Sequence, residues 1–157
     1  MNIRLAKKEE ISEVAKVYAT AFNGVSKESW TLERAGALLQ YWVQKQPDLF
    51  FVAVDNGKII GAITMGIKPW FDGVRLQDGE LFVSSEYQKQ GVGKLLLKKV
   101  LEKALAKYQV STLECVTFAG NTFPKTWYEK IGLKKSEDLI IMTGNCQEIF
   151  KRLNLSN

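Results

Sequence analysis

A polar, glycine-containing turn that leads straight into a long amphipathic helix constrains the fold more than any other feature of this chain. The turn occupies residues 88–94 and reads Gln-Lys-Gln-Gly-Val-Gly-Lys. A short apolar segment with the composition of a strand, residues 79–83, precedes it, and another β-rich segment follows at residues 111–118. Between the turn and the second segment, apolar residues recur at helical spacing: Leu96, Leu97, Val100, Leu101, Ala104 and Leu105. This order predicts a β-α-β crossover.

The chemistry of this turn favours an anion. Amide groups at the start of a helix lack intrahelical acceptors, and the helix dipole adds partial positive charge to them. Glycine lets a ligand approach the backbone closely, and Lys89 and Lys94 add charge, so we expect a phosphate site. Two common phosphate motifs do not match, because Leu96 replaces the third glycine of the dinucleotide fingerprint and Leu95 replaces the Ser or Thr of the P-loop. The alternative is a plain turn whose glycines serve backbone geometry only.

The first half of the chain alternates helical and strand patterns. Helices are expected at residues 7–22 and from the N-cap residue Thr31 to about residue 44. Strands are expected at residues 2–5, 49–54 and 58–67. Asn56-Gly57, between the last two strands, predicts the type I′ turn of a tight hairpin, because both of its positions need positive φ. Residues 69–78 are expected to form a loop in which a further strand starts.

The second half continues as a mixed α/β pattern. A helix opens at Gly120-Asn121 and ends at Ile131-Gly132, where glycine is a favourable C-cap. Residues 133–143 predict one or two final strands, and residues 146–153 predict a terminal helical turn. Because the chain contains no repeat, linker or low-complexity tract, we expect one α/β domain over residues 1–157.

Composition narrows the chemistry and the partners. The chain has no histidine, and its two cysteines, Cys115 and Cys146, lie far apart, which argues against a zinc site and excludes Ser-His or Cys-His nucleophilic catalysis. No apolar run approaches the roughly 20 residues that span a membrane, and the start lacks the apolar core of a secretory signal. The net charge of +5 is spread along the chain without a tight basic run. We expect a cytoplasmic protein with no membrane or nucleic-acid partner.

Two motifs resemble the GNAT superfamily of N-acetyltransferases. Gln88-x-x-Gly91-x-Gly93 is similar to the family signature (Arg/Gln)-x-x-Gly-x-(Gly/Ala), and it likewise follows an L-x-V strand and precedes a long helix. Asn121, followed by Trp-Tyr-Glu-Lys-Ile-Gly-Leu at residues 127–133, is similar to the family's second signature, although its last leucine stands where phenylalanine is more usual. The resemblance implies a mixed, mostly antiparallel sheet of about six to seven strands flanked by about four to five helices, with a central V-shaped splay.

The resemblance also implies acetyl-CoA as the acetyl donor, and no metal. In the family the pyrophosphate lies on the amides of the glycine turn, and the pantetheine arm lies along the strand that ends at Val83, in the gap where that strand splays from residues 111–118. By this resemblance Asn121 hydrogen-bonds the pantetheine and Tyr128 faces the thioester sulfur. The residues expected to contact the cofactor are Leu81, Phe82, Val83, Gln88, Lys89, Gln90, Gly91, Val92, Gly93, Lys94, Asn121 and Tyr128.

The reaction implied is direct transfer of the acetyl group to a primary amine. The backbone N–H at or near Val83 would stabilise the oxyanion, and the phenol of Tyr128 would protonate the departing thiolate. Because the chain has no histidine, a carboxylate must deprotonate the amine, directly or through water, and we select Glu80 over Asp78 on the same strand. The alternatives are a core tyrosine at position 128 and a solvated or ion-paired carboxylate at position 80.

The acceptor is the least constrained part of the prediction. In the family the region between the first two helices and the loop after the hairpin shape its pocket, and here those segments hold aromatic and acidic residues that suit a cationic amine. The residues expected to contact the acceptor are Trp30, Trp70 and Asp78. We expect a small polycationic or aminoglycoside-like amine, against the alternative of core packing and solvated acids. A protein N-acetyltransferase acting on lysine or N-terminal amines and a non-catalytic CoA-binding regulatory module are rival interpretations, and a homodimer through the segment after Gly144 stays open.

Overall fold

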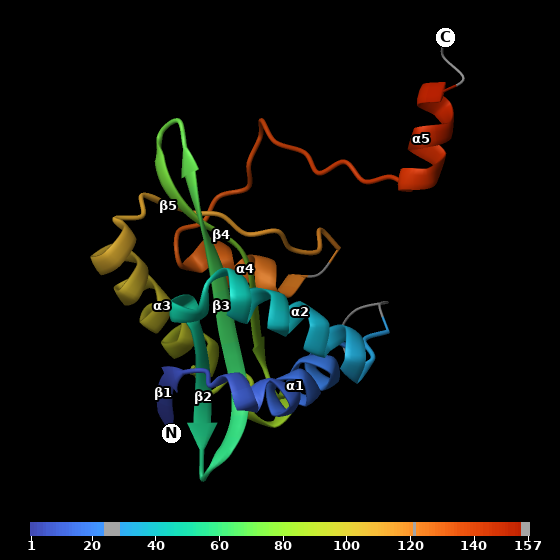
Figure 1. Ribbon diagram of the computed structural model, residues 1–157. Coiled ribbons are helices and arrows are strands. Elements are labelled where there is room, and N and C mark those ends of the chain that lie inside the picture. Colours follow the sequence, from blue (N-terminus) through green and yellow to red (C-terminus); the bar gives the residue numbers. More distant parts are fainter. Residues whose placement is uncertain (24–28, 121, 155–157) are drawn as a thin grey trace. The chain divides into compact units, whose positions relative to one another are not determined.

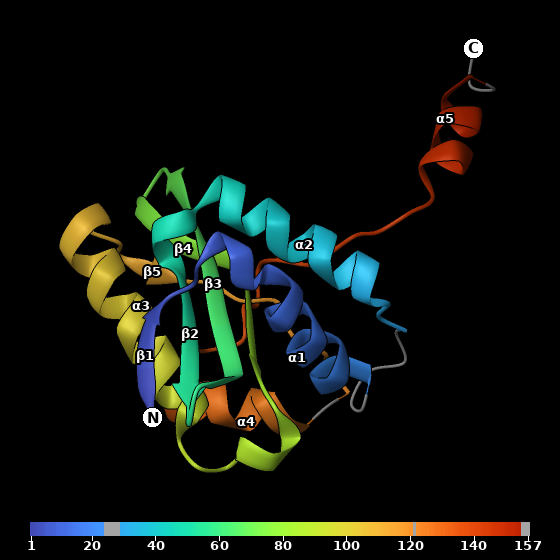
Figure 2. The same cartoon turned by 60° about the horizontal axis from the view of Figure 1, so that its bottom comes forward.

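The computed structural model describes residues 1–23, 29–120 and 122–154, which fall into two compact units, Met1–Val116 and Thr117–Asn157. The first unit is built on a β-sheet. Helices α1 (Ile11–Asn23) and α2 (Leu32–Lys45) lie side by side on one face of this sheet, and α3 (Val92–Tyr108) covers the other face (Figures 1 and 2). The predicted α/β class is therefore confirmed.

The sheet has five strands within the described residues, and their order in space is their order in the chain. They are β1 (Asn2–Leu5), β2 (Phe50–Asp55), β3 (Lys58–Trp70), β4 (Gly73–Val83) and β5 (Thr112–Leu113). All neighbours are antiparallel except the parallel pair β4–β5, which agrees with a mostly antiparallel sheet. Asn56 and Gly57 have φ values of 45° and 78°, so the predicted type I′ hairpin between β2 and β3 is confirmed.

Strand β4 is longer than the sequence indicated. The strand expected to start within residues 69–78 does so, at Gly73, but the loop itself is shorter than expected, because Trp70 lies opposite Gly73 and only Phe71 and Asp72 form the turn. Proline and glycine at the two sides of this turn hid the strand signal, since both residues are uncommon inside strands. Leu76 is fully buried in β4, which shows that this part of the strand belongs to the core.

Local signals place the helices of the first unit correctly. Thr31 caps α2 with its side chain, whose Oγ1 accepts a hydrogen bond from the backbone N–H of Arg34 at 3.2 Å. Helix α1 begins after a short 3₁₀ segment, Lys8–Glu10, and further 3₁₀ segments at Pro47–Leu49 and Ser85–Tyr87 precede β2 and the glycine turn. The buried residues of α3 recur at helical spacing and form its core face: Val92, Leu96, Leu97, Val100 and Ala104.

The second unit contains α4 (Thr122–Lys130) and α5 (Cys146–Asn154). Gly132 has φ 102° and Leu133 N–H donates to Tyr128 O at 3.0 Å, which confirms the predicted C-cap of α4. The strands expected at residues 133–143 are not formed, because this segment pairs with no described strand and an isolated strand is not stable. The sheet of the described residues therefore stops at five strands rather than six or seven, and β5 covers only two residues of the strand expected at 111–118. Among the described helices, none has the length and apolar character that crossing a bilayer requires.

Candidate active site

The glycine turn presents a row of backbone amides at the start of α3. Lys89 and Gly91 adopt positive φ values of 61° and 84°, and α3 begins directly after Gly91. The backbone bonding of the helix starts with Leu95 N–H, which donates to Gly91 O at 3.1 Å. The N–H groups of residues 92–94 precede this first bond and have no intrahelical acceptor. These amides and the exposed lysines beside them are arranged to receive an anion.

Gly91 leaves open space at this turn. A Cβ atom at Gly91 would meet nothing within 4 Å, and one at Gly93 would lie 4.0 Å from Val83 Cγ2. The side chain of Gln88 points back instead, and its Nε2 donates to Val83 O at 3.0 Å. The glutamine therefore ties the turn to the end of β4, and the glycines leave room in front of the amides.

The end of β4 offers free backbone groups beside the turn. Ser84 N–H donates to Ile60 O at 2.8 Å, and the register continues with Val83 opposite Gly61. Hydrogen-bonded and non-hydrogen-bonded pairs alternate along an antiparallel ladder, so the N–H groups of Leu81 and Val83 point away from β3. On that side β5 pairs only with the first part of β4, and no described strand covers the edge from residue 77 to residue 83. This is the splay that the sequence led us to expect.

A β-bulge places Gln77 and Glu80 on the same face of the sheet. Thr64 lies opposite Glu80 and Gly66 lies opposite Gln77, so a step of two residues in β3 matches a step of three in β4. Without the extra residue, side chains three positions apart would point to opposite faces. A Cβ atom at Gly79 would overlap the backbone and a side chain of β3, so the bulge requires glycine at this position.

Glu80, the predicted base, faces α1 and lies beside an aromatic cluster. Tyr18 of α1 donates its hydroxyl to Glu80 Oε2 at 3.1 Å. The Tyr18 ring packs edge-on against Trp30 at 5.0 Å and against Phe82 at 4.9 Å, and it lies 4.5 Å from Phe22. The structure thus brings the predicted base and Trp30, a predicted acceptor contact, together through one tyrosine.

Tyr18 is the site residue that sequence reasoning missed. Its position fits the apolar face of a helix, and its side chain is only 2% exposed, so it reads as a core residue. Its hydroxyl reaches a carboxylate 62 positions later in the chain, and no local pattern carries that information. Phe82 has a similar double role, because its backbone belongs to the open end of β4 while its ring joins the aromatic cluster.

Other predicted site residues lie apart or outside the described atoms. Trp70 is 42% exposed at the tip of the β3–β4 hairpin, roughly 20 Å along the strand from Glu80. Tyr128 is half-buried on α4 of the second unit, with its ring 5.1 Å from that of Trp127. Residue Asn121 and the side chain of Asp78 lie outside the described part of the structure.

The described residues give no support to catalysis by a cysteine nucleophile or by a bound metal ion. Cys115 is half-buried, and burial together with the nearby Glu114 carboxylate raises the pKa of its thiol, which lowers its thiolate fraction at neutral pH. Within residues 1–23, 29–120 and 122–154, no group of three or more acidic, cysteine or histidine side chains is placed to hold a metal ion.

Comparison with known proteins identifies the family. The chain matches the Acetyltransferase (GNAT) family over residues 11–133. An uncharacterized N-acetyltransferase of Archaeoglobus fulgidus is 30% identical to it over 112 residues, covering 68% of this chain and 76% of that protein. The chain belongs to the GNAT family of acetyltransferases. The family match and the names of these relatives support the assignment of this GNAT chain as an N-acetyltransferase.

Two further comparisons extend the likeness of this GNAT chain. An uncharacterized N-acetyltransferase of Methanocaldococcus jannaschii is 23% identical over 140 residues, which are 86% of this chain and 61% of that protein. An aminoglycoside N-acetyltransferase solved in complex with CoA shares the fold with a TM-score of 0.69 and 21% identity, over 92% of this chain and 95% of that chain. GNAT enzymes use acetyl-CoA as acetyl donor, and the open amides of the glycine turn and of β4 fit such a ligand.

Proposed function

We propose that this GNAT chain transfers an acetyl group directly from acetyl-CoA to a primary amine of a small molecule. One observation carries the proposal: the uncovered end of β4 joins the open amides of the glycine turn on one side to the Glu80 carboxylate on the other. Bound acetyl-CoA would supply an activated acetyl thioester. The chain would supply fixed donors for the ligand and a proton acceptor for the amine, which are the groups that direct transfer needs.

The donors come from the backbone. The amides of residues 89–94 would hold the pyrophosphate, and Lys89 and Lys94 would add favourable charge. The N–H groups of Leu81 and Val83, which point away from β3, would pair with the pantetheine arm and polarise the acetyl carbonyl. Tyr128 stays our proposed donor of the proton to the thiolate, and Asn121 our proposed pantetheine contact, both by resemblance to the family.

Glu80 is the proposed proton acceptor. Its carboxylate lies on the face of the sheet covered by α1, and the Tyr18 hydroxyl fixes one of its oxygens at 3.1 Å. A carboxylate held in this way keeps one orientation, so it can take a proton from an amine directly or through a water molecule. Tyr18 would act as a positioning residue rather than as a catalytic one.

A cationic acceptor fits the surroundings of Glu80. A carboxylate beside the rings of Tyr18, Trp30 and Phe82 combines the two groups that attract an ammonium ion. The aminoglycoside N-acetyltransferase that shares the fold supports a small polycationic amine as the acceptor class. We further propose the cytoplasm as the compartment, which the two free cysteines support.

Titration of acetyl-CoA by calorimetry tests the donor site, with Gly91→Asp and Gly91→Asn as a matched pair. Both side chains tolerate the positive φ at this position better than other residues do, and they differ by one charge. We expect wild type to bind and the aspartate variant to bind at least about tenfold more weakly than the asparagine variant, because its carboxylate would repel the pyrophosphate. Equal affinities of the two variants, or no binding by wild type, would contradict the proposed site.

A screen of acceptors completes the test once binding is established. Thiol release would be followed with polyamines, aminoglycosides and lysine-containing peptides at equal amine concentration. Turnover with the small polycations supports the proposed acceptor class. Turnover restricted to peptides would favour a protein N-acetyltransferase, and acetyl-CoA binding without turnover on any amine would favour a regulatory module.

A further inference from the structure

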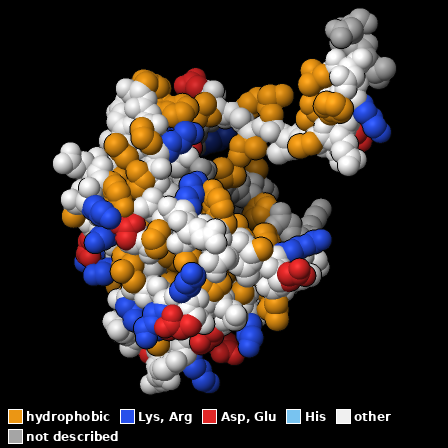
Figure 3. Space-filling model, viewed as in Figure 1, with side chains coloured by type: hydrophobic (Ala, Val, Ile, Leu, Met, Phe, Trp, Pro, Cys, Tyr) orange, Lys and Arg blue, Asp and Glu red, His pale blue; other side chains and the backbone are white. Residues whose placement is uncertain are grey.

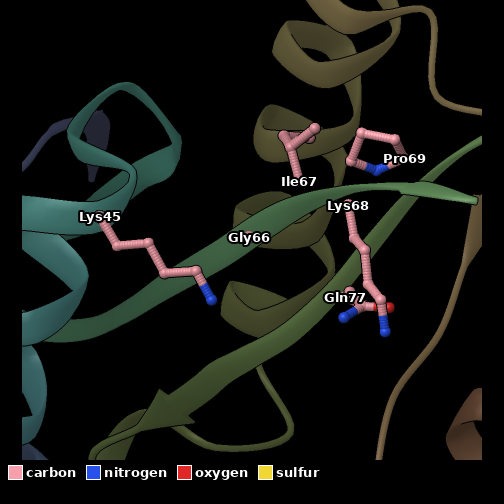
Figure 4. Close-up of a pocket in the computed structure, with 6 residues that line it drawn as sticks. All are labelled: Lys45, Gly66, Ile67, Lys68, Pro69 and Gln77. Atoms are coloured by element: carbon pink, nitrogen blue, oxygen red, sulfur yellow. The ribbon is translucent and has the colours of Figure 1, made fainter.

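A hollow of about 340 Å³ lies between the end of α2 and the β3–β4 hairpin. It is lined by Lys45, Gly66, Ile67, Lys68, Pro69 and Gln77, all of them in the first unit. Figure 4 shows Lys45 extending from α2 toward Gly66, and the side chain of Lys68 lying beside Gln77. Two ammonium groups from different elements therefore face one space, and the lining contains no carboxylate.

The charge of these two lysines is not compensated within the described residues. Neither Lys45 nor Lys68 forms an ion pair with a described carboxylate, whereas Lys107 lies 2.7 Å from Asp48. Aromatic rings hold both side chains: Lys45 Nζ lies 5.0 Å from the centre of the Trp42 ring, and Lys68 Nζ lies 4.4 Å from that of Trp70. A ring contact orients an ammonium group but leaves it with donors for an anion.

Strands β3 and β4 form the floor of the hollow. Gly66 is among its lining residues, and Trp42 packs against it, 3.2 Å from where a Cβ atom would stand. Gln77, which lies opposite Gly66, brings a largely buried amide to the same space. We propose that this hollow binds an oxyanion, either a carboxylate or a phosphate, between Lys45 and Lys68.

The hollow lies on the same face of the sheet as the proposed base. Gln77 and Glu80 share that face because of the bulge, and three residues of strand place them about 10 Å apart. In this proposal an acceptor about that long places its amine at Glu80 and an anionic end in the hollow. The alternative source of the same chemistry is a separate small anion. If the acceptor itself supplies the anion, the acceptor is an amine that carries a carboxylate or phosphate, and not a polycation.

Titration with inorganic phosphate tests the hollow without any acetyl transfer. Backbone amide shifts would be followed by NMR at constant ionic strength, in wild type, in the double variant Lys45→Gln/Lys68→Gln, and in Lys103→Gln as a control on the exposed side of α3. We expect saturable shifts at Gly66, Lys68 and Gln77, with affinity lowered about tenfold or more in the double variant and unchanged in the control. Absence of saturable shifts, or shifts kept in the double variant, would overturn the proposal.

A second measurement identifies the source of the anion and rests on the proposed function. Two primary amines of equal length, one ending in a carboxylate and one in an amide, would be compared by kcat/KM. If the acceptor itself supplies the anion, the double variant loses the preference for the carboxylate by about tenfold. If a separate anion binds, the preference stays the same while phosphate binding is lost. Failure of acetyl transfer on every amine would sink the proposed function and leave the phosphate result standing.

Discussion

Two short runs of this chain are both rich in strand-forming apolar residues, but only one of them forms a strand. Residues 79–83 read Gly-Glu-Leu-Phe-Val and form the end of β4, paired with β3 and covered by α1 on one face. Residues 139–142 read Leu-Ile-Ile-Met and are 62%, 83%, 65% and 85% exposed, with no strand partner among the described residues. An apolar β-type sequence is therefore not sufficient for a strand, because a strand exists only where another strand or a helix receives it.

The contrast extends to the helices that follow each run. Helix α3 buries one face, whereas α5 has no buried residue, and Ile149, Phe150 and Leu153 gather on its surface, where Figure 3 shows hydrophobic side chains. Exposed apolar groups of this number are unusual on a protein surface. The first unit thus buries its apolar side chains in a core, whereas the described part of the second unit leaves several of its apolar side chains exposed.

The largest effect is expected at Glu80, which tests whether the end of β4 in the first unit belongs to an active site. Glu80→Gln keeps the shape of the side chain and its contact with Tyr18 but removes the proton acceptor. We expect kcat/KM for acetyl transfer to fall about 10²- to 10⁴-fold, with acetyl-CoA affinity unchanged. Glu102→Gln on the exposed face of α3 is the control. Activity within about twofold of wild type would remove Glu80 from the mechanism and leave Tyr18–Glu80 as a structural hydrogen bond.

The next largest effect is expected at the β-bulge, where one added methyl group should destabilise the β3–β4 pair. Gly79→Ala would place Cβ against the backbone and a side chain of β3, so we expect about 3 kcal/mol less stability in chemical unfolding. Gly36→Ala in α2 meets nothing within 4 Å and should raise stability by about 0.5–1 kcal/mol. If the two variants behave alike, the bulge does not confine β4 as the structure shows.

The sequence predicted those features of the fold and of the candidate site that depend on neighbouring residues, and missed those that depend on distant partners. The Asn56-Gly57 turn, the Thr31 cap and the Gly132 C-cap were all predictable, because each depends on a few consecutive residues. The glycine turn was predictable for the same reason. The position of the bulge at Gly79 and the contact of Tyr18 with Glu80 were not, since each depends on residues far away in the chain.

The same rule explains the two errors in the fold. The loop before β4 was expected to be longer because the partner strand β3, and not their own composition, makes residues 73–78 a strand. The strands expected at residues 133–143 were wrong because their composition is right but no described strand receives them. Sequence composition indicates what can pair, and the distant partner decides what does.

A smaller effect is expected on the stability of the first unit at acidic pH. Burial alone would raise the pKa of Asp48, but hydrogen bonds from Lys107, Tyr108 and Gln46 outweigh it and lower this pKa to about 2. A depressed carboxyl pKa adds stability above the unfolded value near 4, and this stability is lost as the pH falls toward 2. We expect Asp48→Asn to lower the free energy of unfolding by about 1–2 kcal/mol at pH 7 and to reduce its dependence on pH below 4.

The control for this prediction lies in the second region. Asp138 is exposed, so Asp138→Asn should leave the free energy of unfolding at pH 7 within error of wild type. Urea unfolding from pH 2 to pH 7 would measure both variants. An equal acid dependence in wild type and Asp48→Asn would show that the network around Asp48 does not contribute to stability.

The smallest effect is expected in the uncovered run itself. Ile140→Ser and Met142→Ser remove exposed side chains, so each should change the free energy of unfolding by less than about 0.5 kcal/mol. Ile63→Ala in the sheet, where the side chain is 1% exposed, should lower it by about 2–5 kcal/mol. A loss above about 1.5 kcal/mol in Ile140→Ser would mean that something covers this side chain in solution. If that loss grows with protein concentration, a second copy of the chain provides the cover, and if it does not, the chain covers itself.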